Sequence, residues 1–302
     1  MTTSAVAMRE KSFDAMGSRV HLVATSPTAD LAEGERYIRH LEVLWTRFAG
    51  NSDLSRLNAL RTTTVAAETM TLIDHMIEAW RGTAGRFDPT MGAAMRAIGY
   101  DRDFGSGLDS DGRLRRLPGA GCENIQIDRL TSTVTLPDGV HLDAGGIGKG
   151  LAADLLASRL AGADSGVLVN VGGDLKAMGP GPADGAWIVD VAEPTVADGV
   201  IARVALPSDS ALATSTPLKR KWRRGDETAH HLLDPVTGGP HVEPAALITV
   251  VAADAWWAEA VTKQLVGLAP VDAEDLVHEA AALIIDLEGN QHFIGGMEKY
   301  LV

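Results

Sequence analysis

Residues 141–160 read HLDAGGIGKGLAADLLASRL, a glycine-rich turn with one lysine that opens an apolar-periodic segment. The leucines that follow fall at helical spacing and predict a helix over 150–161. Consecutive glycines let a backbone approach a ligand closely, and the free N–H groups at a helix start attract anions. The stretch predicts either a diphosphate cradle, with Lys149 adding a mobile positive charge, or a tight strand-to-helix turn with a solvated lysine.

Neither familiar nucleotide fingerprint fits this turn. A P-loop needs a glycine where Asp143 stands and a Ser or Thr where Gly150 stands. The dinucleotide pattern G-x-G-x-x-G, started at Gly146 and Gly148, meets Leu151 at its third glycine. The sequence therefore argues against both an NTPase and a Rossmann dehydrogenase.

Bulk composition narrows the class of protein. The 302 residues are 45% hydrophobic with a formal net charge of −13, which argues against a nucleic-acid partner. The basic run LKRKWRR at 218–224 is interpreted as a solvated loop or as a contact for an anionic ligand. A single cysteine excludes an internal disulfide. No secretory signal and no apolar membrane span is found, so no membrane role and a cytoplasmic location are expected.

Periodicity predicts helices and strands mixed without a regular βαβ alternation. Helices are expected at 28–48, at 67–81 and from Asp254 to Gly267, and segment 91–122 is expected to be mostly loops. The expected strands are 18–25, 165–175, 187–191, 200–206 and 247–253, with hairpins at 124–136 and 281–296. Without a clear linker, residues 1–302 are expected to form one domain, with a flexible N-terminus at 1–11.

Seven short motifs occur in an order that resembles the ApbE family of FAD:protein FMN transferases. The resemblance runs from about residue 12 to 295. It rests on FDAMGS (13–18), RFAGNSDLSRLN (47–58), GRFDPTMG (85–92), LDAGGIGKGLAAD (142–154), NVGGDLKAMG (170–179), ATST (213–216) and HHLLDPVTGGP (230–240). It implies an α/β (mixed α+β) fold of two intimately connected subdomains.

The resemblance also implies the FAD-contacting positions. Met16 and Phe48 would border the flavin, and Arg86, Phe87 and Asp88 would hold the nucleotide. Phe48 by itself would more often be a core residue, and Asp88 would equally fit a helix cap. With Lys149 added from the glycine-rich turn, the candidate FAD-binding residues are Met16, Phe48, Arg86, Phe87, Asp88, Gly145, Lys149, Leu151 and Leu232.

His231 matches the histidine that takes a proton from the acceptor hydroxyl, although the doublet leaves His230 as an alternative. A neutral imidazole with an ordinary pKa of about 6.5 suits that task, and such a base contributes roughly 10²–10⁴ in rate. A packed or hydrogen-bonded histidine is the structural alternative.

The metal-binding positions depart from the family pattern. Relatives hold a divalent ion, usually magnesium, with an Ala-Asp-x-x-x-Thr helix and a backbone carbonyl that matches Gly148. Here WWAEAVTKQL (256–265) has Glu259 for the Asp and Lys263 for the Thr. An ammonium has no lone pair for a metal. Three interpretations stay open: Lys263 replaces the metal charge as a catalytic group, the site is degenerate, or Glu259, Gly148 and their neighbours re-form a magnesium site.

The activity that the resemblance implies is cleavage of the FAD pyrophosphate. FMN would be attached through a phosphoester to a Thr or Ser hydroxyl of an acceptor flavoprotein, and AMP would leave. Two alternatives are an FAD pyrophosphatase, in which water replaces the hydroxyl, and a catalytically silent FAD-binding protein.

Overall fold

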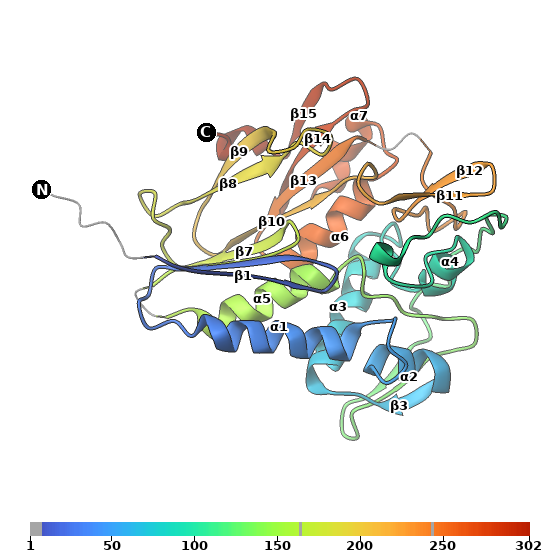
Figure 1. The fold of residues 1–302 in the computed structure, drawn as a ribbon. Helices are drawn as coiled ribbons and strands as arrows, with labels where there is room; N and C mark the ends of the chain where they lie inside the picture. The colour runs from blue at the N-terminus through green and yellow to red at the C-terminus, as the bar shows by residue number, and fades with distance from the viewer. Residues whose placement is uncertain (1–7, 163–164, 243–244) are drawn as a thin grey trace, which may run out of the picture.

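A central antiparallel sheet organises the chain, as the computed structural model in Figure 1 shows for residues 8–162, 165–242 and 245–302. Eight described strands pair in the order β1-β2-β6-β7-β10-β13-β14-β15. Every neighbouring pair is antiparallel. These strands are β1 (Arg9–Ala15), β2 (Ser18–Ala24), β6 (Val167–Val171), β7 (Asp174–Met178), β10 (Ser210–Ser215), β13 (Leu247–Ala252), β14 (Ala280–Ile285) and β15 (Gln291–Ile294).

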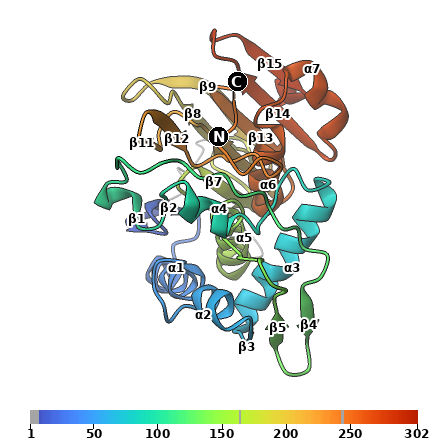
Figure 2. The same ribbon diagram turned by 90° about the vertical axis from the view of Figure 1, so that its right-hand side faces the viewer.

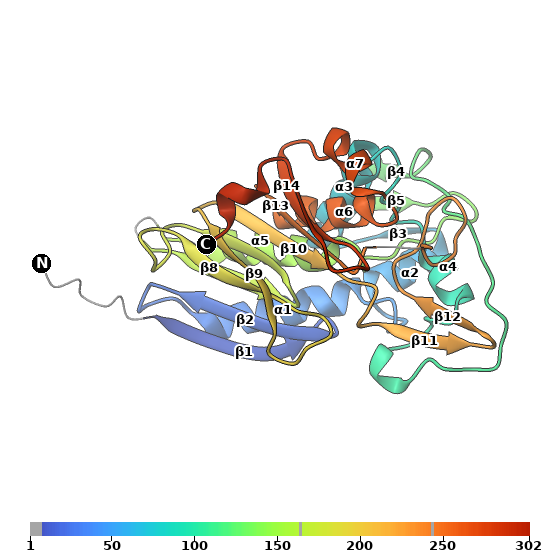
Figure 3. The same cartoon turned by 90° about the horizontal axis from the view of Figure 1, so that it is seen from above.

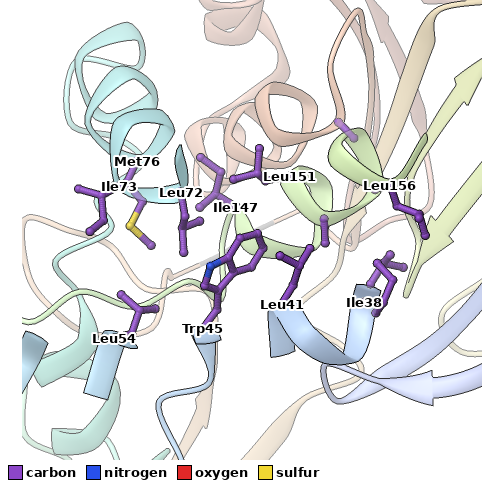
Figure 4. Packing of buried hydrophobic residues seen from close by; sticks show 14 of the residues in the cluster. Ile38, Leu41, Trp45, Leu54, Leu72, Ile73, Met76, Ile147, Leu151 and Leu156 are labelled. Carbon is purple, nitrogen blue, oxygen red and sulfur yellow. The ribbon is translucent and has the colours of Figure 1, made fainter. Parts of the chain in front are cut away.

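Helices cover one face of this sheet. Helix α5 (Gly148–Leu160) lies on β6 and β7, and α6 (Ala255–Leu265) lies on β10 and β13. Helix α1 (Leu31–Trp45) packs beside α5, and α2 (Asp53–Leu60) and α3 (Ala67–Gly82) extend the helical layer (Figure 2). The main core fills the space between them (Figure 4). Its labelled members are Ile38, Leu41, Trp45, Leu54, Leu72, Ile73, Met76, Ile147, Leu151 and Leu156.

Smaller elements complete the molecule. A hairpin of β8 (Trp187–Ala192) and β9 (Val200–Leu206) covers the other face of the sheet (Figure 3). A second hairpin pairs β11 (Lys221–Arg224) with β12 (Glu227–His230) near α4 (Gly92–Ala97). The remaining elements are β3 (Thr62–Thr64), β4 (Gln126–Asp128) and β5 (Thr133–Thr135), which form a small sheet, and the short α7 (Pro270–Ala273).

Helices α5 and α6 cap each other with carboxylates. Asp154 of α5 accepts hydrogen bonds from the backbone N–H groups of Ala255 and Trp256, both at 2.9 Å, at the start of α6. Glu259 of α6 accepts the N–H of Gly150 at 2.8 Å, in the first turn of α5. A carboxylate at a helix start satisfies orphan donors and complements the helix dipole. The two helices are therefore fixed relative to each other at the end that faces the site described below.

Gly150 is needed for this packing rather than for a ligand. A Cβ added at Gly150 would lie 2.3 Å from the carbonyl oxygen of Ala255 and 2.8 Å from the nitrogen of Trp256. Both atoms belong to the α6 backbone, which cannot rotate away as a side chain can. Only glycine lets the two helices approach this closely.

We expect Gly150→Ala to lower the free energy of unfolding by roughly 1–3 kcal/mol, because overpacking against backbone forces α5 and α6 apart. Urea unfolding measures the change. Gly50→Ala is the matched control, since a Cβ at Gly50 has nothing within 4 Å. A Gly150 variant as stable as the Gly50 variant would contradict this account of the helix contact.

The expected elements are largely confirmed. The mixed α/β class holds, and strands or helices occur in every segment where periodicity predicted one. Three expectations are wrong in part: α4 occurs within 91–122, β11 occurs within the basic run, and residues 9–11 of the N-terminus pair with β2. Residues 1–7 lie outside the described residues. None of the described helices combines the length and apolar character that a membrane crossing requires.

The basic run folds as a strand because one of its residues is a core residue. Trp222 is buried among Ile98, Tyr100 and Leu114, and its indole N–H donates to the carbonyl of Ile98 at 3.0 Å. The alternation of Trp222 with charged neighbours is therefore a strand pattern with one buried face.

The expectation that residues 1–302 form one domain stays a prediction.

Candidate active site

A cavity of about 830 Å³ opens where five chain segments meet. Its walls come from the β1–β2 turn, the end of α1, the loop after α4, the turn into α5 and the β11–β12 region. This volume lies in the range that small-molecule and cofactor sites occupy. The predicted residues that it brings together are Met16, Phe48, Gly145, Gly148, Lys149 and His231.

Met16 stands at a strained position in the cavity wall. It forms with Gly17 the two-residue turn between β1 and β2, and both residues have positive φ, 53° and 63°. Such a turn matches the twist of a hairpin but disfavours a side chain at its first position. The Met16 amide donates to a carboxylate oxygen of Glu42 at 2.5 Å, which ties the turn to α1. Strained residues of this kind cluster at ligand sites.

An arginine that the sequence analysis did not select organises the aromatic side of the cavity. The Arg47 guanidinium lies 4.3 Å from the centroid of the Phe48 ring and 4.5 Å from that of Tyr100. Its Nε is 2.8 Å from a carboxylate oxygen of Asp143, and its Nη1 donates to the Tyr100 carbonyl at 2.5 Å. Phe48 remains 44% exposed, so this ring can be covered by a flat ligand. Phe48 is therefore not a core residue.

A smaller cavity of about 70 Å³ adjoins the first, and Asp143, Gly145 and His231 line both. It holds the other predicted residues that face a cavity: Arg86, Phe87, Asp88, Leu232 and Lys263. One Asp88 oxygen accepts hydrogen bonds from the amide and hydroxyl of Thr90, at 2.8 and 2.6 Å. The Asp88 carboxylate thus shapes the loop ahead of α4 and also borders the cavity.

The histidine doublet separates into two roles. His231 lines both cavities, and its Nδ1 has no hydrogen-bond partner among the described residues. Burial lowers the pKa of His231 well below 6.5, and the nearby cations Arg220 and Lys263 lower it further. His230 lies outside both cavities: its Nδ1 accepts from the Leu232 amide at 3.3 Å, and burial lowers its pKa to about 4. Of the two histidines, His231 alone lines these cavities.

The glycine-rich turn is not an open cradle of backbone amides. The amides of Gly145, Gly148 and Gly150 each donate a hydrogen bond inside the protein, at 2.7, 2.7 and 2.8 Å. The expectation that the helix start offers free amides is wrong for these three groups. Leu151 lies in the main core, beside Ile147 in Figure 4, and lines neither cavity. The structure does not bring Leu151 into the site.

The positive charge beside the turn comes instead from two lysines of a buried ion cluster. Lys149 pairs with Asp174 and with Glu259, whose oxygen is 3.2 Å from the ammonium. Lys263 lies 3.6 Å from the same Glu259 oxygen. Burial alone would raise the pKa of Glu259, but the two ammonium groups outweigh it and hold this pKa below its usual range. Burial lowers the pKa of Lys149 to about 8, against the attraction of Glu259.

These residues do not fit a divalent metal ion. Magnesium requires oxygen ligands at about 2.0–2.1 Å in octahedral array. Glu259 already accepts from the Gly150 amide and lies within 3.6 Å of two ammonium groups, which would repel a second cation. Within the described residues, no three His, Cys, Asp or Glu side chains gather in a way that could hold a metal. The interpretation of Glu259 and Gly148 as a magnesium site is thus not supported by the donors present.

The sequence pattern of the ApbE family matches residues 16–285. The chain belongs to the ApbE family. Among curated relatives of this ApbE-family chain, the FAD:protein FMN transferase of Vibrio cholerae is 24% identical over 76% of the chain and 70% of the relative. That of Chlamydia trachomatis is 28% identical over 69% of the chain and 65% of the relative.

Solved structures confirm the ApbE fold. The crystal structure of the ApbE protein of Thermotoga maritima superposes with a TM-score of 0.84 at 24% identity, covering 97% of this chain and 99% of that one. The apo form of the Pseudomonas stutzeri flavinyl transferase ApbE superposes with a TM-score of 0.79 at 21% identity and covers both chains fully. The mixed α/β architecture expected from the resemblance is the architecture of these proteins.

Proposed function

We propose that this chain is an FAD:protein FMN transferase, as its curated relatives are named. It cleaves the pyrophosphate of FAD and attaches FMN to a Thr or Ser hydroxyl of an acceptor flavoprotein, with release of AMP. The observation that carries the proposal is His231, a neutral imidazole at the junction of two cavities and surrounded by cationic side chains.

The larger cavity suits the flavin half of FAD. The exposed face of Phe48 offers a stacking surface, and Met16 adds an apolar edge. Arg220, from the basic run, lines the same cavity and donates to the Gly17 carbonyl at 3.2 Å, which holds its positive charge over the opening. Arg220 is therefore the residue of this run that would contact an anionic ligand.

The diphosphate would lie between the two cavities, with cations on both sides. Lys149 lines the larger cavity, and Arg86 and Lys263 line the smaller one. Cleavage of a phosphoanhydride depends mainly on positioning and on charge stabilisation, because negative charge builds on the departing phosphate. His231 would take the proton from the acceptor hydroxyl as that oxygen attacks the FMN phosphorus.

A direct test incubates the protein with FAD and with a flavoprotein domain that an established FAD:protein FMN transferase modifies. Mass spectrometry of the domain and chromatography of AMP read out the reaction, and the proposal requires FMN on a Thr or Ser residue. Release of FMN and AMP without the acceptor would favour the FAD pyrophosphatase. Binding of FAD with no product in either mixture would favour a silent FAD-binding protein.

The acid limb of the pH profile should lie well below pH 6.5. A base acts in its unprotonated form, so activity falls as pH drops through the pKa of His231. That pKa is lowered in the folded protein, chiefly by burial, so the imidazole stays neutral at pH 6.5. Measuring kcat/KM for FAD against pH reports the free enzyme. A half-loss of kcat/KM at pH 6.5 or above would contradict the assignment of His231 as the base.

The cytoplasmic location expected from the N-terminal sequence stays a prediction. Fractionation of the native cells with an antibody against the chain would test it.

A further inference from the structure

The ammonium of Lys263 sits among oxygen atoms, as a bound cation would. The Ser215 hydroxyl oxygen lies at 3.0 Å, that of Thr262 at 3.2 Å and the nearer Glu259 oxygen at 3.6 Å. Ser215, Thr262 and Glu259 are all buried, the last two fully. Ser215 comes from β10 and the other two from α6, so the arrangement depends on the packing of α6 on the sheet.

One donor of this ammonium points to no described partner at hydrogen-bond distance. Two of its three N–H groups are used by the Ser215 and Thr262 hydroxyls, and 3.6 Å to Glu259 exceeds hydrogen-bond length. The Lys263 side chain is 18% exposed and lines the smaller cavity with His231. Its remaining N–H can therefore meet a phosphate oxygen that lies beside His231.

The carboxylate behind this ammonium is balanced without a metal. Two carboxylates, Glu259 and Asp174, face two ammonium groups, Lys149 and Lys263. One oxygen of the fully buried Glu259 carboxylate lies near both ammonium groups, 3.2 Å from that of Lys149 and 3.6 Å from that of Lys263. A negatively charged diphosphate entering beside them meets two ammonium groups that these carboxylates hold in place.

We propose that Lys263, held by Glu259 and aided by Lys149, supplies the charge compensation that a divalent ion would give, so that this chain acts on FAD without a metal. The inference rests on the proposed function. In the step, the acceptor oxygen bonds to the FMN phosphorus, and the bond from that phosphorus to the bridging oxygen breaks. The electron pair leaves on the AMP phosphate, the hydroxyl proton goes to His231, and Lys263 stays protonated and donates to the oxygen that gains charge.

The wild-type protein provides the first test. FAD affinity and FMN transfer are measured in EDTA and in MgCl₂, and bound Mn²⁺ is measured by electron paramagnetic resonance in the FAD complex. We expect the FAD affinity in EDTA to lie within about twofold of that in MgCl₂, and the same for the rate of FMN transfer. We expect no stoichiometric binding of Mn²⁺. A loss of affinity or transfer of about tenfold or more in EDTA, restored by magnesium, would overturn the inference. Stoichiometric Mn²⁺ in the FAD complex would overturn it as well.

Two substitutions at one position provide the second test. Lys263→Met should lower transfer by about 10²–10³-fold with no rescue by magnesium, because a preorganised charge is lost. Lys263→Thr should lose a similar factor in EDTA and regain part of it with magnesium, with Mn²⁺ now bound. Lys299→Thr, at an exposed lysine that lines neither cavity, is the control and should behave as wild type. A Lys263→Thr protein as active as wild type in EDTA would count against the inference.

The failures can be told apart. If wild-type protein binds FAD equally with and without magnesium but transfers no FMN, the proposed function fails, and the affinity comparison supports only the part of the inference that concerns metal-free binding of FAD. If it binds no FAD in either buffer, both fail. Thermal melting of each variant shows whether a loss reflects unfolding, and the wild-type measurements decide the inference even where a variant does not fold.

Discussion

Replacing His231 with Gln is expected to lower kcat for FMN transfer by about 10²–10⁴-fold, the contribution of a positioned general base. FAD affinity should change little, because the cationic and aromatic side chains of the two cavities remain. His231 is the only member of the doublet that lines a described cavity, and its free Nδ1 leaves the imidazole able to take a proton. Transfer is followed by the mass of the flavinylated acceptor, and affinity by the quenching of FAD fluorescence.

His230→Gln is the matched control for this prediction. His230 is the last residue of β12, and both nitrogens of its ring bond to backbone groups: Nδ1 accepts from the Leu232 amide and Nε2 lies 3.2 Å from the His241 carbonyl. Its loss should therefore lower the melting temperature while kcat stays within about tenfold of wild type. A His231 variant with normal kcat, or a larger loss of kcat at His230 than at His231, would show that the roles are assigned the wrong way round.

Glu259→Gln should cost about 3–5 kcal/mol in the free energy of unfolding, the usual effect of removing one partner from a buried ion pair. The amide keeps the shape of the side chain but removes the negative charge that two ammonium groups share, at 3.2 and 3.6 Å. The first turn of α5 also loses a charged cap at Gly150. Urea unfolding monitored by circular dichroism measures the change.

The comparison for Glu259 is Glu33→Gln in α1. Glu33 pairs with Arg36 at 2.8 Å on the surface, where both side chains are about half exposed, so water replaces the lost partner and little change is expected. If Glu259→Gln were no more destabilising than Glu33→Gln, the ion pair with Asp174 alone would be enough to stabilise the buried Lys149 ammonium. The cluster would then not be the fixed assembly on which the role of Lys263 depends.

The packing of α6 connects stability with the site. Helix α6 carries both Glu259 and Lys263 and starts at residues whose amides are held by Asp154 of α5. Asp254 occupies the position before α6, as the sequence predicted, but its side chain makes no capping bond. The cap is supplied by Asp154 of α5. This contact fixes the position of α6 along α5, and so it places Lys263 near Lys149 and the glycine-rich turn. Such a contact between distant segments leaves no local sequence signal.

The candidate site could be predicted only in part. Motifs selected His231, Phe48 and Lys149, and all three line the larger cavity. Nothing in local spacing indicated Arg47 or Tyr100: the first follows α1 and the second lies in a segment interpreted as loops. The aromatic residues around 100–104 gave the available signal, since apolar rings in an otherwise polar loop often cover a ligand or a second segment. Tyr100 forms part of the cavity wall because Trp222 of β11 packs against its ring, and β11 is distant from it in the sequence.

What the sequence by itself determined is most of the helices and strands and the family, because periodicity and short motifs can be recognised from the residues alone. The apolar spacing of 150–161 required a helix on a buried face, and α5 occupies 148–160 there. Only the tertiary structure decided that Gly150 serves helix packing, that Leu151 is core, and that Glu259 binds two lysines. Those outcomes depend on which backbone and charge another segment brings within about 4 Å, and the antiparallel sheet that joins β6 to β13 sets that distance.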